Sequence, residues 1–439
     1  MVIKRIQLGL IHVALAMTLV PINSTLNRVM IKELAISASL VAVLASLPYL
    51  LSPIQMVIGS FSDRHPVWGL RRTPYILLGL FLCVGGVVIA PYVAFMMTSQ
   101  YWAGIALAAL TFGAWGMGFN FASVSYLSLA SEISGERGRG RTVSVMWFMM
   151  IAGIIVTAIA LSHLLDPFSA AALLRAFQIV AGLALGLGLL GVIGLERRVL
   201  SAAPAAEERV SWGSYLRLVT QNRQVLRFFI YLLLLLAAIL GQDVLLEPFA
   251  GEAFGLPVTA TTRITSIWGG CVLLSLLVAG LLETRMSKRR VAFLGGASAV
   301  LAFGTIALSG ILLDRQVFYA GVVPLGLATG LATVSNLSLM LDMTTARRVG
   351  MYIGAWGMAD ALARGFGAIL SGVVRDSITR VAESPVSGYV VVFALEGLML
   401  VASLVILRQV DVMRFRQEVG GEQDEALDLL ERAALANDA

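Results

Sequence analysis

The chain has 439 residues, of which 58% are hydrophobic and 13% are charged, and its formal net charge is +6. Soluble domains carry about 25% charged residues, so the composition excludes a soluble globular protein and predicts an integral membrane protein. The positive charges are spread among the predicted loops and do not indicate nucleic-acid binding. Both cysteines, Cys83 and Cys271, lie inside apolar stretches and imply no disulfide framework.

Twelve apolar stretches are long enough to cross a bilayer as helices, for which about 20 residues suffice. A longer polar break separates six of them from the other six. The sequence therefore predicts an all-α membrane protein with an N-terminal bundle (1–195), a cytoplasmic linker (196–224), a C-terminal bundle (225–408) and an acidic cytoplasmic tail (409–439). The predicted spans cover roughly residues 6–30, 37–61, 73–97, 101–130, 142–164, 171–195, 225–249, 260–283, 291–313, 317–341, 347–374 and 386–407.

Lys and Arg residues gather on one side of these spans. With the N-terminus inside, the inner segments hold 24 of the 32 basic residues and the outer segments hold 7, while Arg364 lies within a span. Cytoplasmic loops carry an excess of such residues, so both termini are predicted to be cytoplasmic. We expect the first apolar stretch to remain as a span and not to be cleaved as a signal peptide.

The tail after Arg408 differs from the loops because it holds eight acidic residues against three arginines. Leucines at positions 427, 430 and 435 lie among these charges, which favours a short surface helix within Glu422–Leu435. Two roles fit such a segment. It either keeps the inner face solvated or docks a partner.

The loop after the second span combines a glycine, an acid and arginines. Gly59, Asp63 and Arg64 are followed closely by Arg71 and Arg72. A small residue such as Gly59 lets helices approach closely, and Asp63 can meet a helix N-terminus or an arginine of the adjacent bundle. Such contacts must break when two bundles rock, so we predict a conformational-switch loop. The alternative for the two later arginines is that they only hold the loop inside.

A degraded copy of this loop occurs at residues 280–290, in the C-terminal half. A second sequence repeat also relates the two halves. When the C-terminal half is shifted by 210 residues, the end of span 4 aligns without gaps on the end of span 10. Two six-span halves related by an axis along the membrane normal are the architecture of the major facilitator superfamily. The matched residues are Gly116, Ala122, Ser123, Val124, Ser125, Leu127, Ser128, Leu129 and Glu132 with Gly326, Ala332, Thr333, Val334, Ser335, Leu337, Ser338, Leu339 and Asp342.

Three ionisable residues lie deep in spans 11 and 12, where a charge costs a few kcal/mol and usually faces a cavity or a partner. Asp360 and Arg364 are four residues apart on one helix face, with the acid first, which is the better order for pairing. Glu396 lies near mid-depth. The three residues form either a buried network that fixes helix packing or a site for a proton or a polar ligand group.

Three more ionisable residues lie near the outer ends of spans 1 and 7. Arg28 belongs to span 1, and Asp243 and Glu247 belong to the equivalent helix of the other half. We predict that Arg28 pairs with Asp243 or Glu247 across the two halves and thereby closes the outer side.

Histidine is scarce, with His12, His65 and His163 only. His12 lies about a turn into span 1, where a neutral imidazole can ligate a metal, including magnesium at the centre of a chlorin. The alternative is a histidine that bonds to a neighbouring helix. No His/Cys cluster has metal-ligand spacing, so no metal site is predicted. No glycine-rich phosphate loop is present either, which argues against transport driven by ATP.

Four segments go beyond what the superfamily requires. They are Thr25-Leu-Asn-Arg28-Val-Met-Ile-Lys-Glu33-Leu, Gly69-Leu-Arg71-Arg72-Thr-Pro74-Tyr75, Gln242-Asp243-Val-Leu-Leu-Glu247-Pro248-Phe and Gly354-Ala-Trp356-Gly357-Met-Ala-Asp360-Ala-Leu-Ala-Arg364-Gly365. Together these segments resemble the PucC/LhaA family, also called the bacteriochlorophyll delivery family, of photosynthetic bacteria. The resemblance covers nearly the whole chain.

This resemblance implies an assembly factor for light-harvesting antenna complexes in the bacterial inner membrane. The implied partners are antenna polypeptides, bacteriochlorophyll, membrane lipids, and pigment-synthesis enzymes or the insertion machinery. No tightly bound cofactor is expected, and bacteriochlorophyll or a precursor is a transient cargo with His12 as its candidate ligand. Some family members carry the label of a bacteriochlorophyll synthase subunit. However, prenyl transfer would need aspartate-rich magnesium-binding motifs that this sequence lacks, so no enzyme activity is predicted.

Three functions remain open at this stage. The first is pigment delivery through an apolar groove of small residues. The second is proton-coupled transport of a small amphipathic solute through Asp360 or Glu396, and the third is a scaffold that never binds pigment. The groove residues are Gly113, Gly116 and Gly118 on span 4, and Gly354, Gly357, Gly365 and Gly367 on span 11. Plain helix packing is the alternative role for these glycines.

Overall fold

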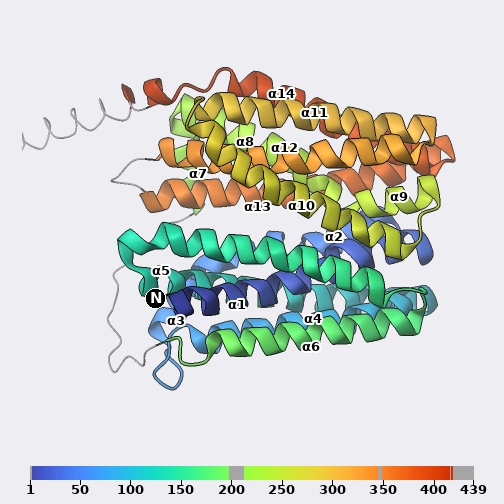
Figure 1. Cartoon of the computed structure of the whole chain (residues 1–439), viewed down its shortest axis with the longest axis horizontal. Helices are drawn as coiled ribbons and strands as arrows, with labels where there is room; N and C mark the ends of the chain where they lie inside the picture. The colour runs from blue at the N-terminus through green and yellow to red at the C-terminus, as the bar shows by residue number, and fades with distance from the viewer. Residues whose placement is uncertain (1, 197–211, 345–348, 416, 419–439) are drawn as a thin grey trace, which may run out of the picture.

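The computed structural model describes residues 2–196, 212–344, 349–415 and 417–418. Its helices run along the long axis of the molecule and form two groups that lie side by side across that axis, one holding α1–α6 and the other α7–α14 (Figure 1). The tail helix predicted within Glu422–Leu435 lies outside the described residues.

The N-terminal group follows the predicted spans, with two departures from regular α-helix. The first span continues from an α-helix into π-helical turns that begin at a proline. The second is interrupted by a short 3-10 turn. The elements are α1 (Val2–Val20), η1 (Pro21–Leu26), η2 (Val29–Glu33), α2 (Ala38–Leu50), η3 (Ser52–Ile54), α3 (Gln55–Arg64), α4 (Thr73–Ser99), α5 (Tyr101–Leu164) and α6 (Ala170–Val192).

The C-terminal group repeats this plan. The segment predicted as a linker contains a helix of its own, α7, and Asn222 then caps α8 by accepting hydrogen bonds from the backbone of Gln224 and Val225. The elements are α7 (Trp212–Gln221), α8 (Arg223–Gly241), η4 (Gln242–Val244), α9 (Leu246–Phe254), α10 (Val258–Glu283), α11 (Lys288–Leu312), α12 (Arg315–Asp342), α13 (Val349–Ala382) and α14 (Pro385–Leu407).

The number of membrane spans agrees with the prediction. Among the described residues, 11 helices are long and apolar enough to cross a membrane, and the number rises to 12 if the bent pair Ala38–Ile54 and Val57–Arg64 is one span. The two parts of this pair meet at 56°. Pro53 lies in the turn between them, where a residue without a backbone N–H interrupts the helix.

Large apolar side chains remain exposed on the outward faces of both groups. Phe81 is 54% exposed, Leu110 is 71% exposed and Leu301 is 72% exposed. Many other large apolar side chains are exposed in the same way along the spans of both groups. The faces that carry them are therefore suited to contact lipid.

The two groups meet along two pairs of helices, α2 with α13 and α5 with α10. Glycines on these helices permit the close approach. A Cβ atom at Gly372 would lie 2.7 Å from the carbonyl oxygen of Ala38, and one at Gly269 would lie 3.1 Å from the side chain of Ile155. The interface between the halves thus depends on small residues, as in other packed membrane helices.

The internal repeat has a structural counterpart in each half. A Cβ at Gly116 would meet Pro48 on span 2, and a Cβ at Gly326 would meet Cys271 on span 8. The acids that end the repeat also match. Glu132 pairs with a basic residue before span 3, and Asp342 pairs with one before span 9. The repeat therefore marks positions with the same packing and the same ion pair.

Spans 4 and 5 form one continuous element, α5, with a single break. Gly135 has φ 60° and ψ 175°, a conformation that is essentially restricted to glycine. The chain can therefore reverse between the two spans without a longer loop.

Replacing Gly135 with Ala should destabilise the protein by about 1–3 kcal/mol, because a Cβ is strained at this φ and ψ. Thermal unfolding of the purified chain in detergent measures the effect. Gly182 is a matched control, since it lies within α6 and a Cβ there would meet nothing within 4 Å. Gly182→Ala should be neutral or slightly stabilising. Equal unfolding temperatures for the two variants would contradict the role of Gly135.

Candidate functional site: a polar gate between the two halves

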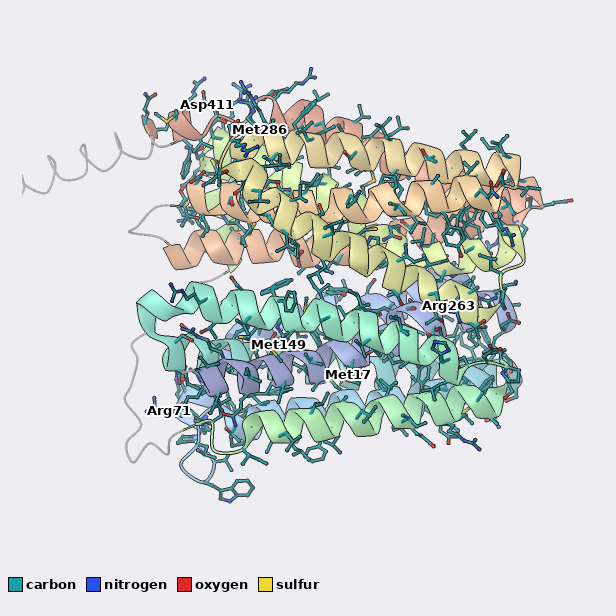
Figure 2. The ribbon with its side chains drawn as sticks, in the orientation of Figure 1. Met17, Arg71, Met149, Arg263, Met286 and Asp411 are labelled. Atoms are coloured by element: carbon teal, nitrogen blue, oxygen red, sulfur yellow. The ribbon has the colours of Figure 1, made fainter. Side chains whose placement is uncertain are left out.

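The charged loops and the outer segments lie at opposite ends of the molecule. Arg71, Met286 and Asp411 lie toward the end that holds the N-terminus, and Arg263 lies toward the other end (Figure 2). Following the predicted orientation, we call the end with the N-terminus the inner end and the opposite end the outer end. The polar contacts between the halves are described in these terms.

A buried carboxylate joins the two halves at the outer end. Glu247 of α9 is only 3% exposed, and one of its oxygens accepts hydrogen bonds from Ser24 of η1 and from Thr265 of α10. The hydroxyl oxygens of Thr265 and Ser24 lie 3.2 Å apart, with Glu247 accepting the hydrogen bond of each. The π-helical turn η1 therefore presents a hydroxyl to the other half, and the three side chains form a closed polar cluster.

Arg28 does not form the predicted ion pair with Asp243 or Glu247. Its guanidinium is 1% exposed, binds Glu33 at 2.6 Å and donates to the backbone carbonyl of Leu256 at 3.0 Å. The π-helical turns explain the difference, because a π-helix brings residues five apart onto one face. Arg28 still reaches the other half, but it does so through a carbonyl.

A second contact between the halves caps the outer end of span 2. The carboxylate of Asp376 in α13 accepts from the backbone N–H of Ala38 at 3.2 Å, and from the N–H and hydroxyl of Ser39 at 2.7 and 2.6 Å. Ser37 is the N-cap residue of α2, but its side chain makes no capping bond. The cap therefore comes from the opposite half, where a negative charge meets the positive end of the helix.

Arg375 anchors this cap. It binds Asp376 at 3.0 Å and Glu252 at 2.9 Å, and it lies over the ring of Tyr389 at 4.9 Å. Burial raises the pKa of the Glu252 carboxyl above its ordinary value, and the guanidinium of Arg375 opposes that rise. As the pH falls, this ion pair therefore weakens sooner than one made by an exposed glutamate.

These contacts together close the outer end, and we call them the outer gate. They come from both halves and combine side-chain acceptors with backbone groups at helix ends. The residues of the outer gate are Ser24, Arg28, Lys32, Ala38 and Ser39 on the N-terminal side and Glu247, Gly251, Leu256, Thr265 and Asp376 on the C-terminal side.

The pairing of Asp360 with Arg364 is confirmed, at 3.0 Å along α13. Arg364 also lies over the ring of Tyr49 on α2, 5.4 Å from its centroid, which is a contact between the halves. Asp243, whose carboxylate accepts a bond from Gln242 at 2.7 Å, lies within electrostatic range of Arg364. The charges of spans 7 and 11 thus form one group around Arg364.

Glu396 belongs to the interior of the C-terminal half. It is 2% exposed, and one oxygen accepts a bond from Ser371 at 2.9 Å. Its other oxygen is buried without a hydrogen-bond partner. A Cβ at Gly241 would lie 3.1 Å from this carboxyl, so the glycine leaves space for the acid between α8 and α14.

The loop after span 2 forms its ion pairs within the N-terminal half. Arg72 is 6% exposed and lies between Asp63 at 2.6 Å and Glu132 at 2.9 Å. Of the two partners predicted for Asp63, an arginine of the adjacent bundle is wrong, because Asp63 pairs with Arg72 of its own half, which is the N-cap residue of α4. Arg64 is exposed. A Cβ atom at Gly59 would lie 3.5 Å from the side chain of Val124, which is an ordinary contact distance.

The start of α4 is capped by an acid that the sequence did not indicate. Glu196, just after span 6, accepts from the backbone N–H groups of Arg71, Arg72 and Thr73 at 2.7–3.2 Å. The carboxylate meets the positive end of the helix. Arg71 thus contributes to the loop through its backbone.

His12 lies in the interior of the N-terminal half. Its ring is 7% exposed and packs against Tyr126 at 5.1 Å and Trp147 at 5.9 Å between centroids. A hydrogen bond links the ring to the backbone of Met146, and Nδ1 has no partner. The free nitrogen suits a ligand, although the ring is buried beside Tyr126 and Trp147. The role of His12 as a pigment ligand stays a prediction.

Most of the glycines proposed to line a groove contact neighbouring helices. A Cβ at Gly116, Gly118 or Gly367 would lie within 3 Å of other atoms, and one at Gly365 would lie 3.3 Å from Leu50. Packing therefore accounts for these positions. Gly113 and Gly357 are different, because a Cβ at either would meet nothing within 4 Å.

Sequence reasoning missed the residues that act through backbone groups or hydroxyls. Asp376 and Arg375 follow directly after predicted span 11, where they read as loop residues. Ser24 and Thr265 lack charge, and Tyr49 gives no signal in an apolar helix. One usable signal was the adjacent pair Arg375-Asp376 at the end of a predicted span. A carboxylate in that position can cap the N-terminus of a neighbouring helix.

A family model described as PUCC protein matches residues 25–415 of the chain. Protein PucC of Cereibacter sphaeroides is 31% identical over 418 residues, covering 92% of this chain and 91% of that protein. Protein PucC of Rhodovulum sulfidophilum is 32% identical over 406 residues, covering 88% and 87%. A Rhodobacter capsulatus protein named bacteriochlorophyll synthase 44.5 kDa chain is 29% identical over 412 residues, covering 90% and 92%.

Solved structures of transporters share the fold. The nucleoside transporter NupG superposes with a TM-score of 0.70 at 15% identity, covering 93% of this chain and 98% of that chain. The D-xylose-proton symporter gives a TM-score of 0.70 at 14% identity, covering 94% and 98%. These structures have the major facilitator superfamily fold, so the predicted fold class is confirmed.

Replacing Asp376 with Ala should open the outer gate, because the carboxylate accepts three hydrogen bonds from the other half and each bond to a charged group contributes about 1.5–3 kcal/mol. The measurement is labelling of a Thr262→Cys reporter by a membrane-impermeant maleimide, in a chain with Cys83→Ser and Cys271→Ser. Thr262 is buried at the outer end beside Thr25. Labelling should accelerate at least about tenfold.

Ser162→Ala is the matched control, since it removes one long contact at the same end, the 3.4 Å bond from Arg263. This control should label at nearly the unmodified rate. Asp376→Asn keeps one acceptor oxygen and should fall between the two. If Asp376→Ala and Ser162→Ala label equally, Asp376 does not hold the gate.

Proposed function

Since the chain belongs to the PUCC protein family, we propose that it is a non-enzymatic membrane protein that serves the assembly of light-harvesting antenna complexes. In this proposal it binds bacteriochlorophyll or a precursor and hands it to antenna polypeptides. It works in the bacterial inner membrane with both termini in the cytoplasm. The observation that carries the proposal is the family match over residues 25–415, which spans both halves and every residue of the outer gate except Ser24.

The closed outer gate favours a cargo that enters the protein laterally from the lipid bilayer. Its contacts close the outer end through buried groups such as Glu247 and Asp376. Apolar side chains such as Leu110 and Leu301 are exposed toward lipid on the outward faces. An apolar macrocycle already dissolved in the bilayer would reach the protein along those faces without crossing the gate.

The polar residues within the spans support a non-enzymatic role. Asp376 caps a helix, Glu247 binds two hydroxyls, and Asp360 pairs with Arg364. Asp376 and Glu247 each join two elements, and Asp360 pairs within α13, so each of these acids has a structural task. We therefore assign no prenyl-transfer chemistry to this chain, although one relative is named as a synthase chain.

Deletion of the gene in its source organism tests the function. The membrane absorption spectrum should lose one antenna band while the reaction-centre bands remain, and the unmodified chain should restore it. Loss of all pigment bands together would point to pigment synthesis instead. An unchanged spectrum would overturn the proposal.

Pigment binding is tested on the purified chain. A chlorin absorption band should co-purify in mild detergent, and His12→Ala should reduce it several-fold while the chain stays folded. His163→Ala is the matched control, because His163 is exposed. If antenna polypeptides co-purify with the chain and no pigment does, the result would favour a scaffold. Pigment retained in full by His12→Ala would remove His12 as the ligand, and esterification of a chlorin acid by the purified chain would show an enzyme.

A second candidate is proton-coupled transport of a small amphipathic solute. The fold is shared with the D-xylose-proton symporter, and the C-terminal half holds Glu396 and the Asp360–Arg364 pair within its spans. Vesicles with an imposed proton gradient distinguish this function. Gradient-dependent uptake that is abolished by Glu396→Gln, without bound pigment, would favour transport over assembly.

A further inference from the structure

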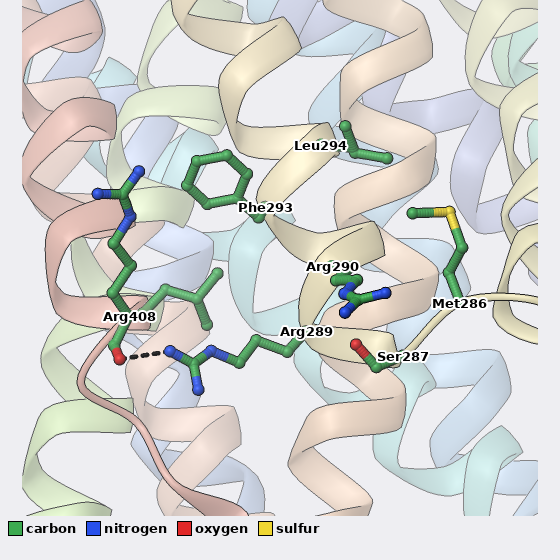
Figure 3. A pocket seen from close by; sticks show the side chains of 8 residues that line it. Met286, Ser287, Arg289, Arg290, Phe293, Leu294 and Arg408 are labelled. Carbon is green, nitrogen blue, oxygen red and sulfur yellow. Dashed lines mark hydrogen bonds between the residues drawn. The ribbon is translucent and has the colours of Figure 1, made fainter.

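A basic pocket lies at the inner end of the C-terminal half, between the start of α11 and the end of α14. Its volume is about 490 Å³, and Arg289, Arg290 and Arg408 line it together with Phe293. Figure 3 shows the three arginines and the ring of Phe293, which lies beside the guanidinium of Arg408. Arg289 donates a hydrogen bond to the backbone carbonyl of Arg408, which ties the two helix ends together.

An apolar groove continues from this pocket. It has a volume of about 500 Å³ and shares two lining residues, Phe293 and Arg408, with the basic pocket. The guanidinium of Arg408 lies over the ring of Phe293, 5.2 Å from its centroid, at the junction. The rest of the groove is lined by Ala297, Val300 and Leu301 of α11 and by Val401, Leu404 and Val405 of α14.

The spacing of these residues gives the groove a direction along the membrane normal. Phe293, Ala297, Val300 and Leu301 recur at intervals of three and four residues, so they share one face of α11. Eight residues of helix rise about 12 Å. One leaflet of the hydrocarbon core is about 15 Å deep, so the groove covers most of the inner leaflet.

Charge and shape together select the occupant. Neither set of lining residues includes an acid, and guanidinium groups bind phosphate oxygens in a bidentate manner. The groove is too small for a partner helix, whose diameter is about 10 Å, but its volume is within the roughly 300–1,000 Å³ of small-molecule sites. The inner leaflet supplies a ligand with an anionic head and an apolar tail.

We propose that this pocket and groove bind one anionic phospholipid of the inner leaflet. Arg289, Arg290 and Arg408 hold its phosphate, and an acyl chain lies in the groove beyond Phe293. The site connects α11 with α14, and it lies on the outward side of the C-terminal half. The proposal is independent of the proposed function, because it requires neither pigment nor antenna polypeptides.

Native mass spectrometry of the delipidated full-length chain tests the site. Phosphatidylglycerol and phosphatidylcholine with the same acyl chains are titrated side by side, together with glycerophosphoglycerol as a head group without tails. Phosphatidylglycerol should bind most tightly. The double variant Arg289→Gln and Arg408→Gln should weaken it about 25-fold, which is about five-fold for each arginine near a membrane surface.

Matched variants separate charge from groove. Arg141→Gln with Arg223→Gln removes two exposed arginines from other inner helix ends and should leave binding unchanged. Ala297→Phe fills the groove and should weaken phosphatidylglycerol while all arginines remain. Ile311→Phe adds the same ring at the exposed outer end of α11 and should have no effect.

Three results would overturn the proposal. Equal affinity for phosphatidylglycerol and phosphatidylcholine would show that charge does not select the lipid. Equal affinity for glycerophosphoglycerol and the whole lipid, or no effect of Ala297→Phe, would show a phosphate site without a tail groove. Equal weakening by the two arginine pairs would show a diffuse attraction to the basic inner surface.

Discussion

Polar groups buried between membrane helices must find their partners inside the protein, since the hydrocarbon core offers no water. The N-terminus of α2 shows this constraint most clearly. Its first backbone N–H groups point toward α13, and Asp376 satisfies two of them along with the hydroxyl of Ser39. The helix end and the carboxylate satisfy each other, so the two halves stay together at this point while both groups remain buried.

The constraint makes the two ends of the molecule different. At the outer end, Arg28 and Asp376 satisfy backbone groups of the opposite half. At the inner end, Arg72 lies between two carboxylates of its own half, and Lys288 pairs with Asp342 within the other half. The charged loops therefore stabilise each bundle separately, and the halves are tied by the gate. The sequence repeat includes the ion pairs within each bundle, through Glu132 and Asp342, and does not include the contacts of the gate between the halves.

The sequence predicted what depends on periodicity and composition. The spans follow from apolar length, and the Asp360–Arg364 pair follows from a spacing of four in a regular α-helix. The pair predicted for Arg28 with Asp243 or Glu247 across the halves is not formed, because η1 and η2 are π-helical. In such turns a residue lies over the fifth residue along the chain, which brings Glu33 to Arg28. No local signal apart from Pro21 marks this change of geometry.

The outer gate could not be predicted for a second reason. The residue that caps α2 comes from the opposite half of the chain. In a soluble protein, Ser37 before an apolar run would be assigned as the N-cap of α2 by its own side chain. Here the cap is Asp376, 338 residues from Ala38 in the sequence. When water cannot serve the free N–H groups, an acid on a neighbouring helix takes that place. Its identity then depends on how the halves pack, which one sequence does not reveal.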